Sequence, residues 1–235
     1  METNYLLLSI GTATFGFVIW FLLSASLRLP KTFQIQFDIN GPFINRIFRR
    51  RILMFILYAM IPYLLIVVWN VLGNVTTPDL GINFGWNSKA TFWVLILVPV
   101  AVIYNLFASK SDSNLTEFPE IRVTRWTIRI FILSALTWAF QVFAMEFLYR
   151  GLLLQSLRAH GLSDLIAIIL STGVYTMSHY FKQNLITILS IPYGLLACYI
   201  VIDTSSLLPV IIIHLANALC NEWFSIWRHP EIRTS

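Results

Sequence analysis

Four ionisable residues lie inside long apolar stretches of this 235-residue chain: Glu146, Arg150, His179 and His214. The chain is 57% hydrophobic and only 11% charged, so such side chains are exceptions within its apolar stretches. A charged group at the centre of a membrane costs about 2.5–3.5 kcal/mol on insertion scales. The default hypothesis is therefore that these four residues form a functional site.

The chemistry that these residue types favour is hydrolysis. A carboxylate can act as general base toward a water molecule, while imidazoles orient that water or donate to a developing oxyanion. Two histidines and a carboxylate also match a catalytic zinc site, so zinc held by Glu146, His179 and His214 is an alternative, although no HExxH motif is present. The purely structural alternative is an ion pair, because Glu146 and Arg150 are spaced i, i+4 with the acid first.

The elements that must position these residues are membrane-spanning helices. Mean hydropathy is +0.74, and a spanning helix needs about 20 apolar residues. Charge-free stretches of 25, 27 and 20 residues cover 3–27, 52–78 and 90–109. Further apolar segments cover 129–158, 164–182, 182–203 and 203–222. The predicted fold is an all-α polytopic transmembrane bundle of about seven spans.

The distribution of Lys and Arg predicts how the chain sits in the membrane. Six of them lie in 28–51 and only one in 79–89, and basic loops face the cytoplasm. We therefore expect an N-out, C-in protein with 28–51 inside. The stretch 31–45 is expected on the membrane surface, with an interfacial hairpin as the alternative, and 109–125 is typical of a linker.

We expect three parts: N-terminal transmembrane helices with a basic cytoplasmic loop (1–125), a core with the ionisable residues (126–225) and a cytoplasmic tail (226–235). The N-terminus lacks the basic region of a cleavable signal, so the first span is expected to be retained. The composition excludes a disordered chain, a disulfide scaffold and a nucleic-acid binder. Cys198 and Cys220 both lie within apolar runs.

Three short motifs follow one another in the core: MEFLYRG at 145–151, YTMSH at 175–179 and HLAN at 214–217. In order and separation they resemble the three motifs of the CPBP family, the CAAX proteases and bacteriocin-processing enzymes. Those motifs read Glu-Glu-x-x-x-Arg followed by Gly, an aromatic residue four positions before His, and His followed four positions later by Asn or Asp. The resemblance covers about residues 126–225.

Two positions depart from the family pattern. Met145 stands where the family has its first Glu, the one usually assigned as the base that activates water. Adjacent helical positions differ by about 100°, so Glu146 takes over that place only if the helix is distorted or rotated. Ala218 occupies the fourth position after His214, while Asn217 and Asn221 lie on roughly the face of His214.

The resemblance implies an intramembrane endopeptidase whose site opens into a cavity between helices. Glu146 would hold or deprotonate the water, His179 would share the proton transfer, and His214 with Asn217 or Asn221 would stabilise the oxyanion. Arg150 would fix Glu146. We expect no cofactor beyond the zinc alternative, and the resemblance implies a membrane protein or lipidated peptide as substrate.

Two other functions remain alternatives at this point. One is a catalytically inactive family member that serves as a membrane scaffold or partner-binding subunit, with Glu146 and Arg150 purely structural. The other is a transporter, because intramembrane Glu and His can relay protons. The expected location is a bacterial inner membrane, with the lipid bilayer and a protein substrate as partners and no nucleic acid.

Overall fold

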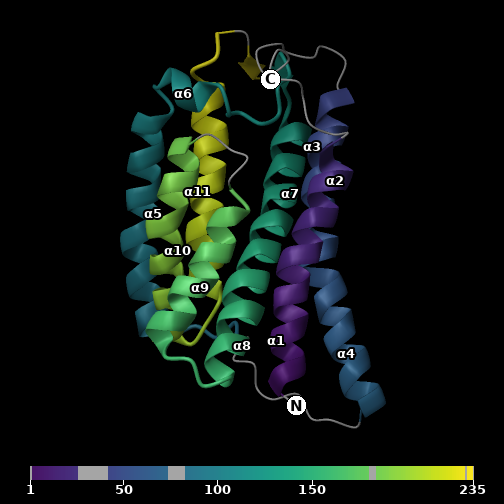
Figure 1. The fold of residues 1–235 in the computed structure, drawn as a ribbon. Coiled ribbons are helices and arrows are strands. Elements are labelled where there is room, and N and C mark those ends of the chain that lie inside the picture. The colour runs from purple at the N-terminus through teal and green to yellow at the C-terminus, as the bar shows by residue number, and fades with distance from the viewer. Residues whose placement is uncertain (1, 26–41, 74–82, 180–183, 231, 235) are drawn as a thin grey trace.

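The fold is a bundle of long helices that run roughly along one common direction (Figure 1). A computed structural model describes residues 2–25, 42–73, 83–179, 184–230 and 232–234. Most of the stretch 31–45, which we expected on the membrane surface, lies outside the described residues, as does the first part of the connection 79–89.

Three of the predicted spans are helices interrupted by a π-helical segment. They run α1 (Glu2–Gly11), η1 (Thr12–Gly16), α2 (Phe17–Ala25); α3 (Pro42–Phe55), η3 (Ile56–Met60), α4 (Ile61–Gly73); and α7 (Ile128–Glu146), η4 (Phe147–Leu153), α8 (Leu154–Ala159). The remaining elements are α5 (Ser88–Ala108), α6 (Asp112–Leu115), α9 (Asp164–Met177), α10 (Asn184–Thr204), α11 (Leu208–Ile226) and the two-residue strands β1 (Arg125–Trp126) and β2 (Arg233–Thr234).

The described helices confirm the prediction of an all-α polytopic membrane protein. Among the described residues, six helices are long and apolar enough to cross a membrane. The predicted segment 164–182 differs, because α9 has only 14 residues. At about 1.5 Å per residue this helix measures about 21 Å, which is shorter than a hydrocarbon core of about 30 Å. We therefore count α9 as a helix that crosses only part of the membrane. In the bundle as a whole, α1 begins at one end and α11 ends at the other (Figure 1).

Local sequence fixes where the helices α5, α7 and α9 begin. Asn87, Thr127 and Ser163 each precede one of these helices, and each side chain accepts a hydrogen bond from the backbone N–H three residues later. Such a cap satisfies an amide that has no partner within the helix. The starts of three helices that surround the ionisable residues are therefore set by short polar signals.

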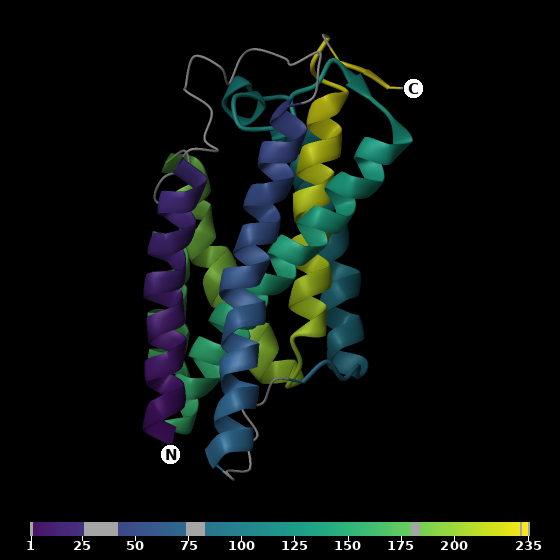
Figure 2. The same cartoon turned by 90° about the vertical axis from the view of Figure 1, so that its right-hand side faces the viewer.

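The central helix of the bundle is α7. Figure 1 shows it between α5, α9, α10 and α11 on one side and α1 to α4 on the other, and Figure 2 shows it crossing the bundle obliquely. It contacts α3 and α11, and every residue of its continuation η4 is buried. This burial on all sides keeps Glu146 and Arg150 away from lipid.

The three π-helical segments contact one another at one level of the bundle. A Cβ at Gly16 in η1 would lie 3.5 Å from the ring of Tyr58 in η3. Tyr58 in turn packs edge-on against Tyr149 in η4, with ring centroids 6.1 Å apart. The wide turn of η4 leaves room for Ser171 of α9, whose hydroxyl donates to the Tyr149 carbonyl at 2.7 Å. π-helical turns often occur at functional sites.

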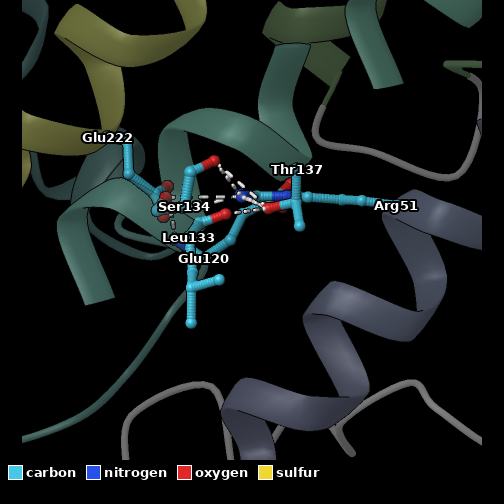
Figure 3. A network of polar contacts seen from close by, with 6 residues as sticks. All are labelled: Arg51, Glu120, Leu133, Ser134, Thr137 and Glu222. Atoms are coloured by element: carbon cyan, nitrogen blue, oxygen red, sulfur yellow. Dashed lines mark hydrogen bonds and ion pairs between the residues drawn. The ribbon is translucent and has the colours of Figure 1, made fainter. Parts of the chain in front are cut away.

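The structure corrects the sequence-based placement of Arg51, which we had expected at the boundary of a cytoplasmic connection. It lies within α3 and is only 1% exposed. Its Nη2 is 2.9 Å from Glu120 Oε2 and 3.5 Å from Glu222 Oε1. Its Nη1 donates to the hydroxyls of Ser134 and Thr137 (Figure 3). The physical reason is that two acidic side chains shielded from water require a cation beside them.

The same cluster ties the connection 109–125 to the bundle. The carboxylate of Glu222 in α11 accepts the backbone N–H of Glu120 at 2.9 Å, and Asn114 donates to Ser225 Oγ at 3.0 Å. Trp126 is fully buried, and β1 pairs with β2 in parallel. The stretch that resembled a linker is therefore packed against the end of α11.

Candidate functional site

Glu146 and Arg150 form an ion pair at the junction of α7 and η4. Both side chains are completely buried, and Arg150 Nη1 lies 3.2 Å from Glu146 Oε2. The guanidinium carbon lies 4.0 Å from the centre of the Tyr175 ring and 5.5 Å from that of Tyr193. A cation stacked on aromatic faces is stabilised where water is absent. The i, i+4 pair predicted from spacing is therefore present.

Glu146 also contacts a second helix through His214. His214 Nδ1 in α11 lies 2.6 Å from Glu146 Oε1, and the hydroxyl of Tyr193 in α10 donates to the same oxygen at 3.2 Å. A carboxylate that accepts from an imidazole N–H fixes the ring orientation and the tautomer. Glu146 therefore does more than neutralise Arg150, because it holds the histidine of the third motif.

His179 lies just beyond α9 and has different contacts. Its Nδ1 is 3.2 Å from the Tyr175 carbonyl oxygen and 3.2 Å from Ser178 Oγ, and its ring centroid is 4.6 Å from that of Tyr175. A carbonyl only accepts, so we assign the proton to Nδ1, which leaves Nε2 with its lone pair. The Tyr175 ring contacts both His179 and the Arg150 guanidinium.

A cavity of about 340 Å³ opens beside these residues, between α5, α7, α9, α10 and α11. Both His179 and His214 line it, so the two histidines of the separate motifs meet at one space. Most of its wall is apolar. The other side-chain amides and hydroxyls in the wall are those of Tyr104, Asn105, Gln141, Tyr175, Ser190, Tyr193, Asn217 and Asn221.

The wall of the cavity includes Met145 but not Glu146. The position at which the related motif has its first Glu thus faces the space where a substrate would lie. Glu146 is completely buried behind His214. The structure therefore places Glu146 one layer behind the cavity, whereas the sequence-based hypothesis had it hold or deprotonate the water.

The two asparagines after His214 lie in the same cavity wall, as their spacing predicted. Asn217 Oδ1 accepts a hydrogen bond from Asn105 Nδ2 of α5 at 2.8 Å. Asn221 lies one turn further along α11, and Ala218 between them is buried and also part of the wall. His214, Asn217 and Asn221 thus present one ring nitrogen and two side-chain amides along one helix.

A zinc ion held by Glu146, His179 and His214 does not fit these contacts. Glu146 Oε1 is already hydrogen-bonded to His214 Nδ1, and its Oε2 is paired with Arg150 Nη1 at 3.2 Å. Within the described part of the chain, no three His, Cys, Asp or Glu side chains lie close enough together to hold a metal ion. We therefore derive no step through a metal.

Two side chains of the site were missed by sequence reasoning. Tyr193 donates to Glu146, and in the sequence it is one residue of the apolar segment 182–203 with no charge to mark it. Asn105 lines the cavity and binds Asn217. In the sequence, Asn105 is the one carboxamide residue of the charge-free stretch 90–109. Because it is not ionisable, it was not among the candidate site residues.

Residues 125–220 match the sequence profile of a protein family described as type II CAAX prenyl endopeptidase Rce1-like. This range contains Glu146, Arg150, His179, His214 and Asn217, and it excludes Asn105 of α5. No curated protein and no solved structure matches the chain.

Proposed function

The chain belongs to the Rce1-like family of type II CAAX prenyl endopeptidases, and from this membership we propose that it is an intramembrane endopeptidase. The observation that carries the proposal is the contact of 2.6 Å between His214 Nδ1 and Glu146 Oε1 at the wall of the cavity. A buried carboxylate bound to Nδ1–H leaves Nε2 of the same ring as a base. The pair therefore supplies a proton acceptor that faces the space where a peptide bond would lie.

In the proposed mechanism His214 takes a proton from a water molecule that attacks the peptide carbonyl. Glu146 stabilises the imidazolium that forms, as a carboxylate does behind the histidine of a hydrolytic triad. Asn217 and Asn221 donate N–H groups to the oxyanion of the tetrahedral intermediate. His214 then returns the proton to the leaving amine, while Nε2 of His179 accepts a hydrogen bond from the attacking water.

The proposed substrate is a membrane protein or a lipidated peptide. The cavity lies among helices that are long enough to span the membrane, and apolar side chains such as Leu97, Val100, Ile186 and Leu189 form much of its wall. Apolar walls with a few convergent polar groups are typical of sites that bury an apolar ligand. The proposed location is a bacterial inner membrane, in an N-out, C-in orientation.

One observation favours a second function. Met145 occupies the cavity wall at the position of the family's first Glu, so the described wall has no carboxylate of its own. A family member that has lost peptidase activity and binds a membrane partner would also have this wall. On that alternative Glu146 and Arg150 serve stability alone.

The test is cleavage by the purified full chain in liposomes. The probes are a fluorescence-quenched peptide with a farnesylated Cys-aliphatic-aliphatic-X C-terminus and the same peptide without the lipid. We expect His214→Ala to lower the cleavage rate by about 10²–10⁴, the usual general-base contribution. Cys220→Ala is the control on the same helix, because Cys220 is not in the cavity wall.

Cleavage of only the unlipidated peptide would retain the peptidase and reject the prenyl substrate. A folded wild-type chain that cleaves neither peptide would reject the peptidase and favour the scaffold. An equally active His214→Ala variant would reject His214 as the proton acceptor.

A further inference from the structure

We propose that Asn105 of α5 is a positioning residue that turns the side-chain amide of Asn217 so that its Nδ2 donates into the cavity. The inference rests on the proposed function, because it assigns a direction to an oxyanion donor. It also extends the site beyond residues 125–220, into a helix that the family match does not cover.

The direction follows from a chain of donors and acceptors that begins at a backbone carbonyl. Asn105 Nδ2 lies 2.8 Å from the Ala101 carbonyl oxygen in the preceding turn of α5. A carbonyl accepts only, so the group of Asn105 that faces it is the NH₂ and not the oxygen. Both amide ends of Asn105 are thereby assigned by a contact within its own helix.

The same NH₂ group then fixes Asn217. Asn105 Nδ2 lies 2.8 Å from Asn217 Oδ1, and only the oxygen of a carboxamide can accept that N–H. The Asn217 Nδ2 is consequently at the end of the amide that points away from Asn105. No described residue accepts a hydrogen bond from this nitrogen, and Asn217 forms part of the cavity wall. Its N–H groups are therefore free for a ligand.

The burial of Asn105 supports a role beyond packing. The side chain is completely buried, and its Oδ1 has no hydrogen-bond partner among the described residues. An apolar residue of similar size would fill this place without an unsatisfied acceptor. A polar group inside a transmembrane helix is costly to bury, so its presence here requires a reason other than the filling of space.

The consequence is that α5 contributes to the site through α11. These two helices pack closely along their length, so Asn105 and Asn217 are held at a fixed separation. Asn105 does not itself donate to an oxyanion, because both N–H groups of its amide are engaged by Ala101 and Asn217. Its effect must pass through Asn217.

A double-mutant cycle between the two asparagines tests this coupling. The probe is the peptide of the cleavage assay, with and without the farnesyl group, in which a phosphinate replaces the scissile amide and mimics the oxyanion. We expect Asn217→Ala and Asn105→Leu each to weaken phosphinate binding about 10- to 100-fold, the loss of a hydrogen bond to a charged group. In the Asn217→Ala background, Asn105→Leu should change binding by less than about twofold.

Asn105→Asp is a second variant of nearly the same shape. An ionised carboxylate donates no hydrogen bond, so Asn217 must rotate its own NH₂ toward position 105 and away from the ligand. We expect the same loss of phosphinate affinity, and for cleavage a fall in kcat with little change in KM. The control is Ser109→Ala at the C-terminal end of α5, since Ser109 Oγ donates to the Leu106 carbonyl of the last turn and is not part of the cavity wall.

Losses that multiply in the double variant would overturn the proposal, as would unchanged binding by the folded Asn105→Asp variant. Failure of the proposed function gives a different result. A wild-type chain that binds the phosphinate without cleaving peptide would reject the peptidase, and the cycle would still decide the coupling. A wild-type chain that binds neither phosphinate would reject both.

Discussion

The substitution Glu146→Gln separates a peptidase from a scaffold, because Glu146 has two kinds of contact. Its Oε1 accepts from His214 at 2.6 Å and from Tyr193 at 3.2 Å, and a glutamine oxygen can keep both. Its Oε2 lies 3.2 Å from Arg150 Nη1, where a glutamine NH₂ would meet another donor. The variant thus keeps the shape of the site and removes the charge.

The expected loss of stability follows from the burial of the pair. Both side chains are 0% exposed, and breaking a buried ion pair by removing one partner costs about 3–5 kcal/mol. This corresponds to about two to four powers of ten in the folding equilibrium. Combining Glu146→Gln with Arg150→Met removes the unpaired cation and should restore most of the stability. The control is Asp164→Asn, whose exposed pair with Arg158 is worth about 1 kcal/mol or less.

The assays are thermal denaturation of the detergent-purified chain and cleavage of the liposome peptides. We expect the double variant Glu146→Gln with Arg150→Met to be abundant and folded, yet slower by about 10²–10⁴, because His214 loses the carboxylate that supports it as a base. A double variant that is stable and cleaves peptide at the wild-type rate would refute the role given to Glu146. Equal instability of Asp164→Asn would refute the reasoning from burial.

Two further predictions concern packing and charge in the bundle. A Cβ at Gly194 would lie 2.7 Å from Thr172 Cγ2, so Gly194→Ala should lower the free energy of unfolding by about 1–3 kcal/mol. Adding Thr172→Ser removes this methyl group and should recover most of the loss. Arg51→Met leaves Glu222 without its counter-charge and should cost about 3–5 kcal/mol, whereas adding Glu222→Gln should recover at least half. Thermal denaturation measures both series; the contact arguments are wrong if the second substitution of either pair restores nothing.

The convergence of Glu146 with His214 was predictable from the sequence, because isolated ionisable groups inside a membrane require partners. The spacing of Glu146 and Arg150 likewise predicted their ion pair. Whether Glu146 or Met145 faces the cavity was not predictable, since this depends on how far α7 is rotated about its axis. A rotation of about 100° exchanges the places of two adjacent residues, and neighbouring helices decide it.

Arg51 and Asn105 show a second limit of sequence reasoning. Charge at the edge of an apolar stretch predicted an aqueous position for Arg51, but Glu120 and Glu222 are 69 and 171 residues away in the chain, and only the fold brings them together. Asn105 carries no charge, so a criterion based on ionisable residues did not identify it. Its partner lies 112 residues away.

The three contacting π-helical segments bear on how this protein can change by insertion and deletion. Each wide turn stores backbone that an α-helix of the same span would not need. A one-residue deletion within Phe147–Leu153 would remove the extra residue that the wide turn holds and let η4 relax to α-helical geometry, which would move the backbone around Tyr149. The Tyr149 carbonyl would then leave Ser171 Oγ, and Tyr58 would lose its edge contact with the Tyr149 ring. Homologous chains should therefore gain or lose residues in loops and conserve the length between Glu146 and Ala159.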